Sequence, residues 1–392
     1  MRTTTAMRMT VVLTACVLVS AAGCASKPKA AKPGAAKTPP GSAANSTTTA
    51  KAAAGAPKAD KPAHEFTAVE KSAMREKALA MLADMARSDS ALLRANAIEG
   101  LQPVPTRCEP LVRAALVDEN VGVRYVAAMT VGRLKLGGTA PMVRPLLNDP
   151  DPSVRAAAIY ALTLNGVKVD QTELSSILME GSMRARSNVA YILGQIGNSS
   201  AVALLRDSVR QPGASESTTA ARLFRLQAAE AMVDLGDATA RRAIDAALYP
   251  SSPDDLETSV LAAQIIGELK DNKSAQESVT QLRTIVLTPV EGTLVPADPR
   301  KGQFFYPKEL RLAATGSLNK IGFPGGWWVG DMYANDVDPA VRAQAATVLS
   351  QTALKVNESP TLEILDRMMA DESSLVRVTS AAAVVSMLER LK

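Results

Sequence analysis

One string of residues recurs along most of this chain, and it constrains the fold more than any other feature. The copy that begins at Asp149 reads Asp-Pro-Asp-Pro-Ser-Val-Arg-Ala-Ala-Ala-Ile-Tyr-Ala-Leu. Asp and Ser are typical helix N-caps, and Pro152 suits a first turn, where its missing amide hydrogen is not needed. The spacing predicts one apolar stripe along a helix, made of Val154, Ala157, Ala158, Ala161 and Leu162.

Aligned on Arg155, the string occurs in nine copies, and the sixth of these has Ser259 in place of the arginine. The third residue after the anchor is usually alanine, and the seventh is always a medium or large apolar residue. The other anchors are Arg94, Arg124, Arg186, Arg225, Arg311, Arg342 and Arg377. Self-similarity at this period is typical of a solenoid.

A second helix-like run precedes each copy, for example residues 172–179 and 201–209. We therefore predict an all-α fold for residues 64–392, an α-α superhelix of about nine helix pairs around a continuous apolar core. The charges within residues 387–392 are expected to cap the end of the array.

An acidic residue stands six positions before most of the anchor arginines. We interpret these residues as a structural ladder, in which each acid caps its helix and pairs with an arginine of its own or the adjacent repeat. A row of arginines that binds a ligand is the other interpretation. The ladder comprises Asp118, Arg124, Asp149, Arg155, Glu180, Arg186, Asp336, Arg342, Asp371 and Arg377.

Residues 1–23 are predicted to be an export signal, with Arg2 and Arg8 ahead of an apolar run too short to span a bilayer. The run ends in Ser-Ala-Ala-Gly-Cys, which resembles a bacterial lipobox although Ala21 replaces the usual leucine. The resemblance implies cleavage before Cys24 and lipidation of its thiol. An ordinary secretory signal cut after a small residue is the alternative.

Residues 24–63 contain almost exclusively Ala, Lys, Pro, Gly, Ser and Thr, and we predict a disordered tether. The chain has a net charge of +5, of which residues 1–23 contribute two positive charges and the tether a net six. The repeat domain is left with −3, so no broad nucleic-acid-binding surface is expected.

Residues suited to catalysis or metal binding are scarce. Beyond the signal and the lipobox, Cys108 is the remaining cysteine, and His64 is the one histidine of the chain. The sequence shows neither a phosphate-binding glycine loop nor a carboxylate cluster at metal spacing. We therefore expect no catalytic residues, no cofactor and no metal.

The repeat period breaks most strongly within residues 287–337. Residues 284–290 and 293–295 predict a short hairpin around Glu291-Gly292, and the helix expected near residues 325–334 is barely recognisable. Seven of the thirteen aromatic residues lie here: Phe304, Phe305, Tyr306, Phe323, Trp327, Trp328 and Tyr333. They form either a partner-binding site or a structural plug. Of the adjacent tryptophans, one is expected to be buried and the other partly exposed.

The repeated strings, of the type Asp-x-x-x-x-Val-Arg-x-x-Ala-Ala-x-x-Leu, resemble HEAT-like repeats in the short form also seen in phycobilisome lyase subunits. The resemblance covers about residues 67–392. It is specific for architecture and says little about activity. We favour a scaffold or adaptor that binds a protein or peptide partner on its concave surface. The resemblance also admits an enzyme-associated subunit, or a nucleic-acid-binding protein like the HEAT-like DNA glycosylases.

The export signal argues against both alternatives, because those lyases and DNA lie inside the cell. The favoured function is a non-enzymatic scaffold anchored by lipid at the bacterial cell envelope. Ala25 after the cysteine is not the aspartate of inner-membrane retention, so we expect the outer membrane, facing the periplasm.

Overall fold

The computed structural model describes residues 64–214, 218–250, 252, 255–269 and 276–392. The predicted signal peptide, Cys24 and the tether lie outside these residues. The described part is helical, and its β-structure amounts to one isolated bridge between Pro289 and Phe304. The predicted all-α class is confirmed.

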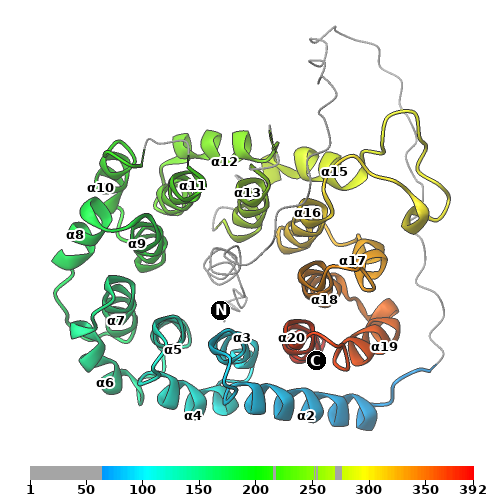
Figure 1. Ribbon diagram of the computed structural model, residues 1–392, viewed down its shortest axis with the longest axis horizontal. Helices are drawn as coiled ribbons and strands as arrows, with labels where there is room; N and C mark the ends of the chain where they lie inside the picture. Colours follow the sequence, from blue (N-terminus) through cyan, green and yellow to red (C-terminus); the bar gives the residue numbers. More distant parts are fainter. Residues whose placement is uncertain (1–63, 215–217, 251, 253–254, 270–275) are drawn as a thin grey trace, which may run out of the picture.

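Nine helices of the described part form an inner row, and each contains one copy of the repeated string (Figure 1). They are α3 (Ala91–Leu101), α5 (Val121–Arg133), α7 (Pro152–Leu164), α9 (Met183–Ile196), α11 (Thr219–Asp234), α13 (Leu256–Glu268), α16 (Lys308–Lys320), α18 (Pro339–Thr352) and α20 (Ser374–Arg390).

A second row lies outside the first and supplies one partner to each inner helix. It consists of α2 (Ala68–Met85), α4 (Pro105–Ala115), α6 (Ala140–Val143) with η1 (Arg144–Asn148), α8 (Thr172–Glu180), α10 (Ala201–Ser208), η2 (Ala238–Ala240) with α12 (Arg241–Ala247), α15 (Val279–Leu287), α17 (Trp327–Tyr333) and α19 (Glu358–Met368). The two rows confirm the predicted helix pairs.

The core lies between the two rows. In all nine copies, the residue three positions after the anchor has no exposed surface, and the residue seven positions after it is at most 9% exposed. Ala158 and Leu162 are examples, at 0% and 1%. Small side chains at the first position let neighbouring helices approach closely, while the larger ones at the second fill the layer.

The structure corrects which acidic residue caps each helix. The N-cap of α7 is Asp151, whose carboxylate accepts a hydrogen bond from the Ser153 amide at 2.8 Å. Asp149 instead accepts from the Asp151 amide at 2.9 Å, which shapes the turn before the helix. The same turn precedes α5, α18 and α20. The two roles are separate because a cap oxygen must reach amides two or three residues ahead.

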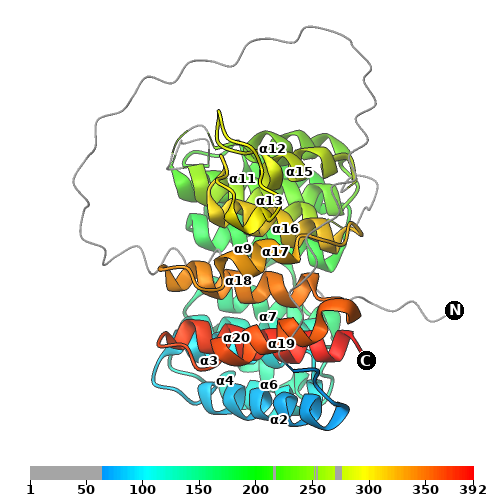
Figure 2. The same ribbon diagram turned by 90° about the vertical axis from the view of Figure 1, so that its right-hand side faces the viewer.

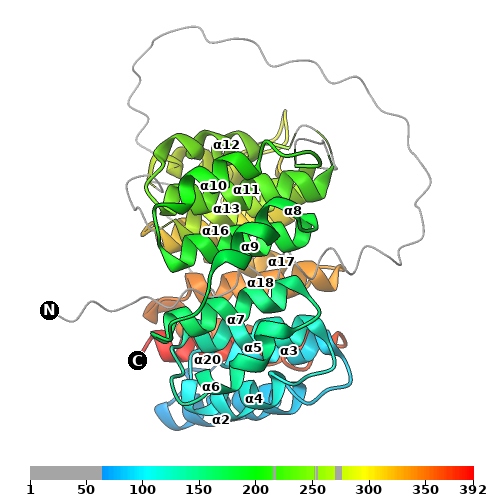
Figure 3. The same ribbon diagram turned by 90° about the vertical axis from the view of Figure 1, so that its left-hand side faces the viewer.

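The array closes into a ring, because α20 packs against both α2 and α3 (Figures 1 and 2). A Cβ atom on Gly100 of α3 would lie 2.7 Å from the Cβ of Ala382 on α20, so the two backbones are in close approach. Figure 3 shows the opposite side, where α7, α9 and α11 follow one another without such a seam.

The C-terminal charges therefore do not cap a free end. Glu389 accepts a hydrogen bond from Arg75 of α2 at 2.6 Å, and Lys77 of α2 reaches Asp366 of α19 at 2.7 Å. Arg390 donates to the main-chain oxygens of Ser350 and Ala353. The contacts of Glu389 and Asp366 join the first and last repeats, while those of Arg390 hold α20 against the end of α18, so the predicted capping role of residues 387–392 is wrong.

Within the irregular segment, helix α15 continues to Leu287, so the predicted hairpin of residues 284–290 with 293–295 does not form. Glu291 and Gly292 do form a turn, with Gly292 at a φ of +80°. Two backbone hydrogen bonds close the base of the loop, from Val290 to Gln303 at 3.1 Å and from Phe305 to Thr288 at 3.0 Å. The barely recognisable helix is present as α17.

Candidate functional site

The aromatic segment surrounds one buried arginine. Arg311 on α16 has no exposed surface, and its guanidinium carbon lies 3.5 Å from the ring centroid of Phe304, 5.5 Å from Trp328 and 5.6 Å from Tyr333. Its Nε donates to the Val286 oxygen at 3.1 Å, and its Nη1 donates to the Tyr333 hydroxyl. Burial lowers the pKa of Arg311, although Tyr333 opposes this shift.

The aromatic rings take the place of the acid that other repeats use. Arg311 is an anchor arginine, and six positions before it stands Phe305 instead of an aspartate. The next acid of the ladder, Asp336, binds Lys308 at 2.6 Å. Ring faces carry partial negative charge and attract a guanidinium, so the segment encloses the arginine without a counter-charge.

Both tryptophans are buried, Trp327 at 8% and Trp328 at 6% exposure, so the expectation that one would be partly exposed is wrong. The Trp327 indole donates to the Thr361 hydroxyl of α19 at 2.8 Å, while the Trp328 ring lies 5.6 Å from that of Phe304. The two side chains do point different ways, but both are covered, because α19 packs on Trp327 and the inserted segment packs on Trp328.

The remaining aromatic residues lie nearer the surface. The half-buried Phe323 stacks against Arg283, with 5.1 Å between the guanidinium and the ring centroid. Phe305 is 65% exposed and meets the half-buried Tyr306 edge-on at 5.1 Å. The Tyr306 ring in turn lies 6.2 Å from that of Tyr249. Of the seven aromatics, only Phe305 is exposed.

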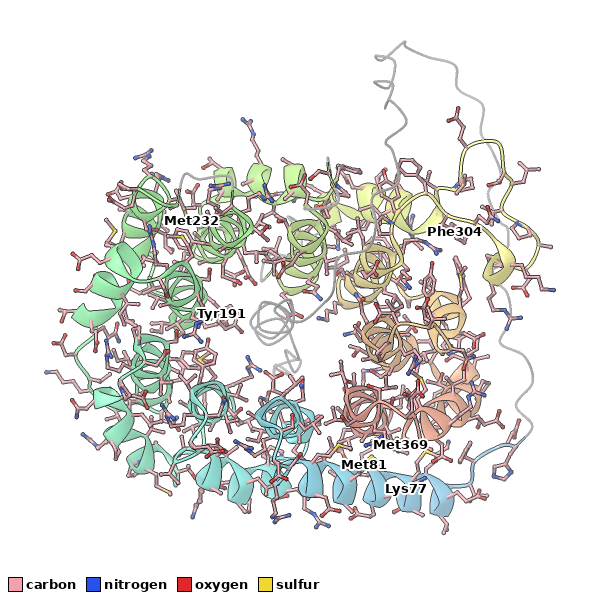
Figure 4. The ribbon with its side chains drawn as sticks, in the orientation of Figure 1. Lys77, Met81, Tyr191, Met232, Phe304 and Met369 are labelled. Carbon is pink, nitrogen blue, oxygen red and sulfur yellow. The ribbon has the colours of Figure 1, made fainter. Side chains whose placement is uncertain are left out.

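Phe305 belongs to a larger group of exposed apolar side chains, which we call the insertion patch. Half of the twelve exposed large apolar residues in the described part of the chain are found here. Leu294 is the most exposed residue of this patch, at 91%. The loop projects from the rim of the ring near Phe304 (Figures 1 and 4). The patch consists of Tyr249, Leu287, Val290, Leu294, Val295 and Phe305.

Sequence reasoning found only Phe305 of the insertion patch. A cluster of aromatics drew attention to the segment, whereas the aliphatic residues Leu294 and Val295 resemble the rest of this apolar chain. The signal that could have identified them is the position of large apolar residues in a loop that contains several Pro and Gly residues, where no helix buries them. Tyr249 follows α12 and is distant in sequence, so only the fold brings it to Tyr306.

The ladder residues form repeated structural contacts. Arg94, Arg124 and Arg342 each hold the aspartate of the following repeat with two hydrogen bonds of 2.7–3.0 Å. The hydrogen bonds from Arg342 keep the pKa of Asp371 below its ordinary value. Such bidentate pairs join adjacent repeats.

Three arginines of the ladder depart from this pattern. Arg155 binds Glu173 of α8 at 2.5 Å rather than Glu180, which is exposed. Arg186 stacks on the Phe224 ring at 4.7 Å and donates to the Ser208 oxygen at 2.6 Å. Arg377 donates to the main-chain oxygens of Asp371 and Glu372.

Among the described residues, no cluster of His, Cys, Asp and Glu could hold a metal ion. No helix in the same residues is long and apolar enough to cross a bilayer. Burial raises the pKa of the Cys108 thiol to about 12, so this side chain is not a thiolate at neutral pH. His64 contacts Glu70 at the outer end of α2.

A family model of HEAT repeats matches residues 77–163, 108–183 and 140–224 of the chain. Among solved structures, the complex of CpcE and CpcF of phycocyanin lyase from Nostoc sp. PCC7120 is 18% identical at a TM-score of 0.39, covering 76% of this chain and all of that one. Human deoxyhypusine hydroxylase in complex with glycerol is 16% identical at a TM-score of 0.29, covering 72% and 88%. No curated protein matches the sequence.

Proposed function

Because the chain is a HEAT-like repeat protein, we propose that it is a non-enzymatic scaffold that binds a protein or peptide partner through the insertion patch. The observation that carries this proposal is the gathering of exposed apolar side chains on and beside the inserted loop of residues 288–303. Leu294 and Phe305 have most of their surface in water, which is costly unless a partner covers them.

The architecture supports this division between scaffold and binding loop. Phe304, Trp328 and Tyr333 surround Arg311, and two backbone hydrogen bonds close the base of the loop. These contacts hold the insertion patch on a rigid support. A surface that needs little ordering on binding loses less entropy when the partner docks. Insertions in repeat proteins commonly form such binding surfaces.

We place this scaffold at the bacterial cell envelope, with a lipid on Cys24 and residues 25–63 as a spacer between membrane and ring. This part of the proposal rests on the sequence of the signal and tether. The outer membrane, facing the periplasm, is the location that Ala25 favours. The partner is then a protein or peptide of the same compartment.

The insertion patch is tested with a double substitution, Leu294→Ser and Phe305→Ser. A photo-crosslinking residue at position 294 first identifies the partner in intact cells, and the purified partner is then titrated with each variant. We expect binding to weaken by about 1 kcal/mol or more per buried anchor, with an unchanged melting temperature. The matched control is Val337→Ser, because Val337 is 92% exposed but lies outside the patch. Equal binding by the wild type, the double variant and the Val337→Ser control would contradict the proposal.

The lipid anchor is tested separately with Cys24→Ser. The wild-type protein should sediment with membranes after cell breakage, whereas the variant should be released or retain its signal. Radiolabelled palmitate should label the wild type alone. If both proteins are equally soluble and equally processed, the anchor is wrong, and the partner-binding proposal is unaffected.

A further inference from the structure

A small hollow lies on the inner side of the ring, over the seam between the first and last repeats. Its volume is about 50 Å³, enough for a few heavy atoms. Asn96 and Glu99 of α3 form one wall, Thr347 and Ser350 of α18 form the opposite wall, and Thr379 and Ala382 of α20 form the floor.

The hollow exists because α20 carries a small residue at an inward-facing position. Ala382 is the fifth residue after the anchor, and the same position in α7 and α9 holds Tyr160 and Tyr191. Figure 4 shows Tyr191 on the inner side of the ring. A methyl group in place of a phenol ring leaves unfilled space between α3 and α18.

Glu99 enters this hollow with an unsatisfied carboxylate. Its side chain is 8% exposed, and its buried Oε2 accepts no hydrogen bond in the described structure. The nearby Arg133 of α5 attracts Glu99 through its charge, but it donates its hydrogen bonds to the Gln102 amide oxygen at 3.0 Å and to the Tyr191 hydroxyl at 3.4 Å. A buried carboxylate without donors is costly, and such groups are uncommon outside functional sites.

The neighbouring polar side chains have already used most of their donor hydrogens. The Asn96 amide donates one of its two hydrogens to the Leu92 oxygen at 2.9 Å, and the Ser350 and Thr379 hydroxyls donate to the main-chain oxygens of Thr347 and Leu375 at 2.8 and 2.9 Å. Each hydroxyl has a single hydrogen, so its oxygen can only accept a further bond. The hollow thus presents oxygen acceptors from three helices, one of them a carboxylate.

From this arrangement we propose that the hollow binds a primary ammonium group, such as that of an alkylamine or a lysine side chain. An ammonium carries three N–H donors and one positive charge, which matches several acceptors around one carboxylate. The apolar side of Ala382 suits the adjoining methylene groups. A ligand here touches α3, α18 and α20 together, so it also strengthens the closure of the ring.

The probe is n-propylammonium chloride, titrated into the full chain at about pH 8, where Glu99 is mostly charged and the amine stays protonated. We expect it to raise the melting temperature of the wild type. Tetramethylammonium chloride at equal ionic strength has the same charge but no N–H donors, and it should leave the melting temperature unchanged.

Three variants locate the effect. Glu99→Gln should weaken propylammonium binding about tenfold or more, because it removes a charged acceptor. Thr379→Val removes a neutral acceptor and should weaken propylammonium binding by a smaller factor. This variant provides the test if Glu99→Gln fails to fold. Glu257→Gln is the matched control: Glu257 of α13 also has a buried oxygen without a hydrogen-bond partner, but it lies outside the hollow.

Unchanged binding in both Glu99→Gln and Thr379→Val would overturn the proposal. An equal rise of the melting temperature with tetramethylammonium would also overturn the proposal, because it would show that positive charge alone causes the effect. Loss of binding in Glu257→Gln would likewise place the amine elsewhere. None of these outcomes involves the insertion patch, so the proposed scaffold function is judged independently.

Discussion

Arg311→Ala is expected to lower the free energy of unfolding by about 3 kcal/mol or more. The substitution leaves a cavity among Phe304, Trp328 and Tyr333 and removes the guanidinium that these rings surround. It also leaves the Val286 oxygen without its hydrogen bond from the side chain. Urea unfolding of the purified protein measures the change.

The control for Arg311 is Arg155→Ala, at the same repeat position but with a side chain that is 25% exposed and paired with Glu173. Its loss should be smaller, on the order of 1 kcal/mol, because water screens a surface pair. If the two substitutions cost the same, the rings that surround Arg311 have no special structural role. A large effect of Arg311→Ala assigns the buried aromatics to the support and leaves the insertion patch as the binding surface.

Glu99→Gln is expected to stabilise the protein by about 3 kcal/mol above pH 7, and to have little effect below pH 4.5. Desolvation raises the pKa of Glu99 from 4.5 to about 7, with partial opposition from Arg133. Between these values the folded protein binds more protons than the unfolded chain. The free energy of unfolding therefore falls as the pH rises through this window, and the full penalty remains above it.

Chemical unfolding across this pH range distinguishes the two proteins, because the free energy of unfolding of the glutamine variant should not fall between pH 4.5 and 7. Glu119→Gln is the matched control, because Glu119 is 88% exposed and its loss should leave the profile unchanged. Parallel profiles for wild type and Glu99→Gln would show that Glu99 is not buried as a charge. A confirmed penalty would mean that the chain keeps a destabilising carboxylate at the seam, as expected for a ligand-binding group.

Local periodicity predicted the repeated units of this protein well. Apolar residues at intervals of three and four identified the helices, and Ala158 and Leu162 are buried as their positions require. The helix near residues 325–334 was expected from the repeat and is present as α17. These features depend on contacts within a repeat or between neighbours, and each copy of the string encodes them again.

The candidate site was predicted only in part. The sequence directed attention to the inserted segment, but the burial of Trp327 depends on Thr361 of α19, which lies 34 positions further along the chain. The burial of Trp328 depends on the position of Phe304 in the inserted segment. The rings of Phe304, Trp328 and Tyr333 surround Arg311 at a position where other repeats place an acid. The missing acid is therefore part of the signal, and the aromatic residues alone do not reveal it. The exposed positions of Leu294 and Val295 follow from the loop that carries them.

By itself, the sequence determined a stack of paired helices with a small-residue row and a large-residue row in its core. Only the tertiary structure decided that the stack closes into a ring, with Gly100 against Ala382 and Arg75 bound to Glu389. The reason is physical: closure depends on the small rotation from each repeat to the next, summed over the whole array. No local pattern reports that sum, so neither the seam nor the hollow containing Glu99 could be read from the repeats.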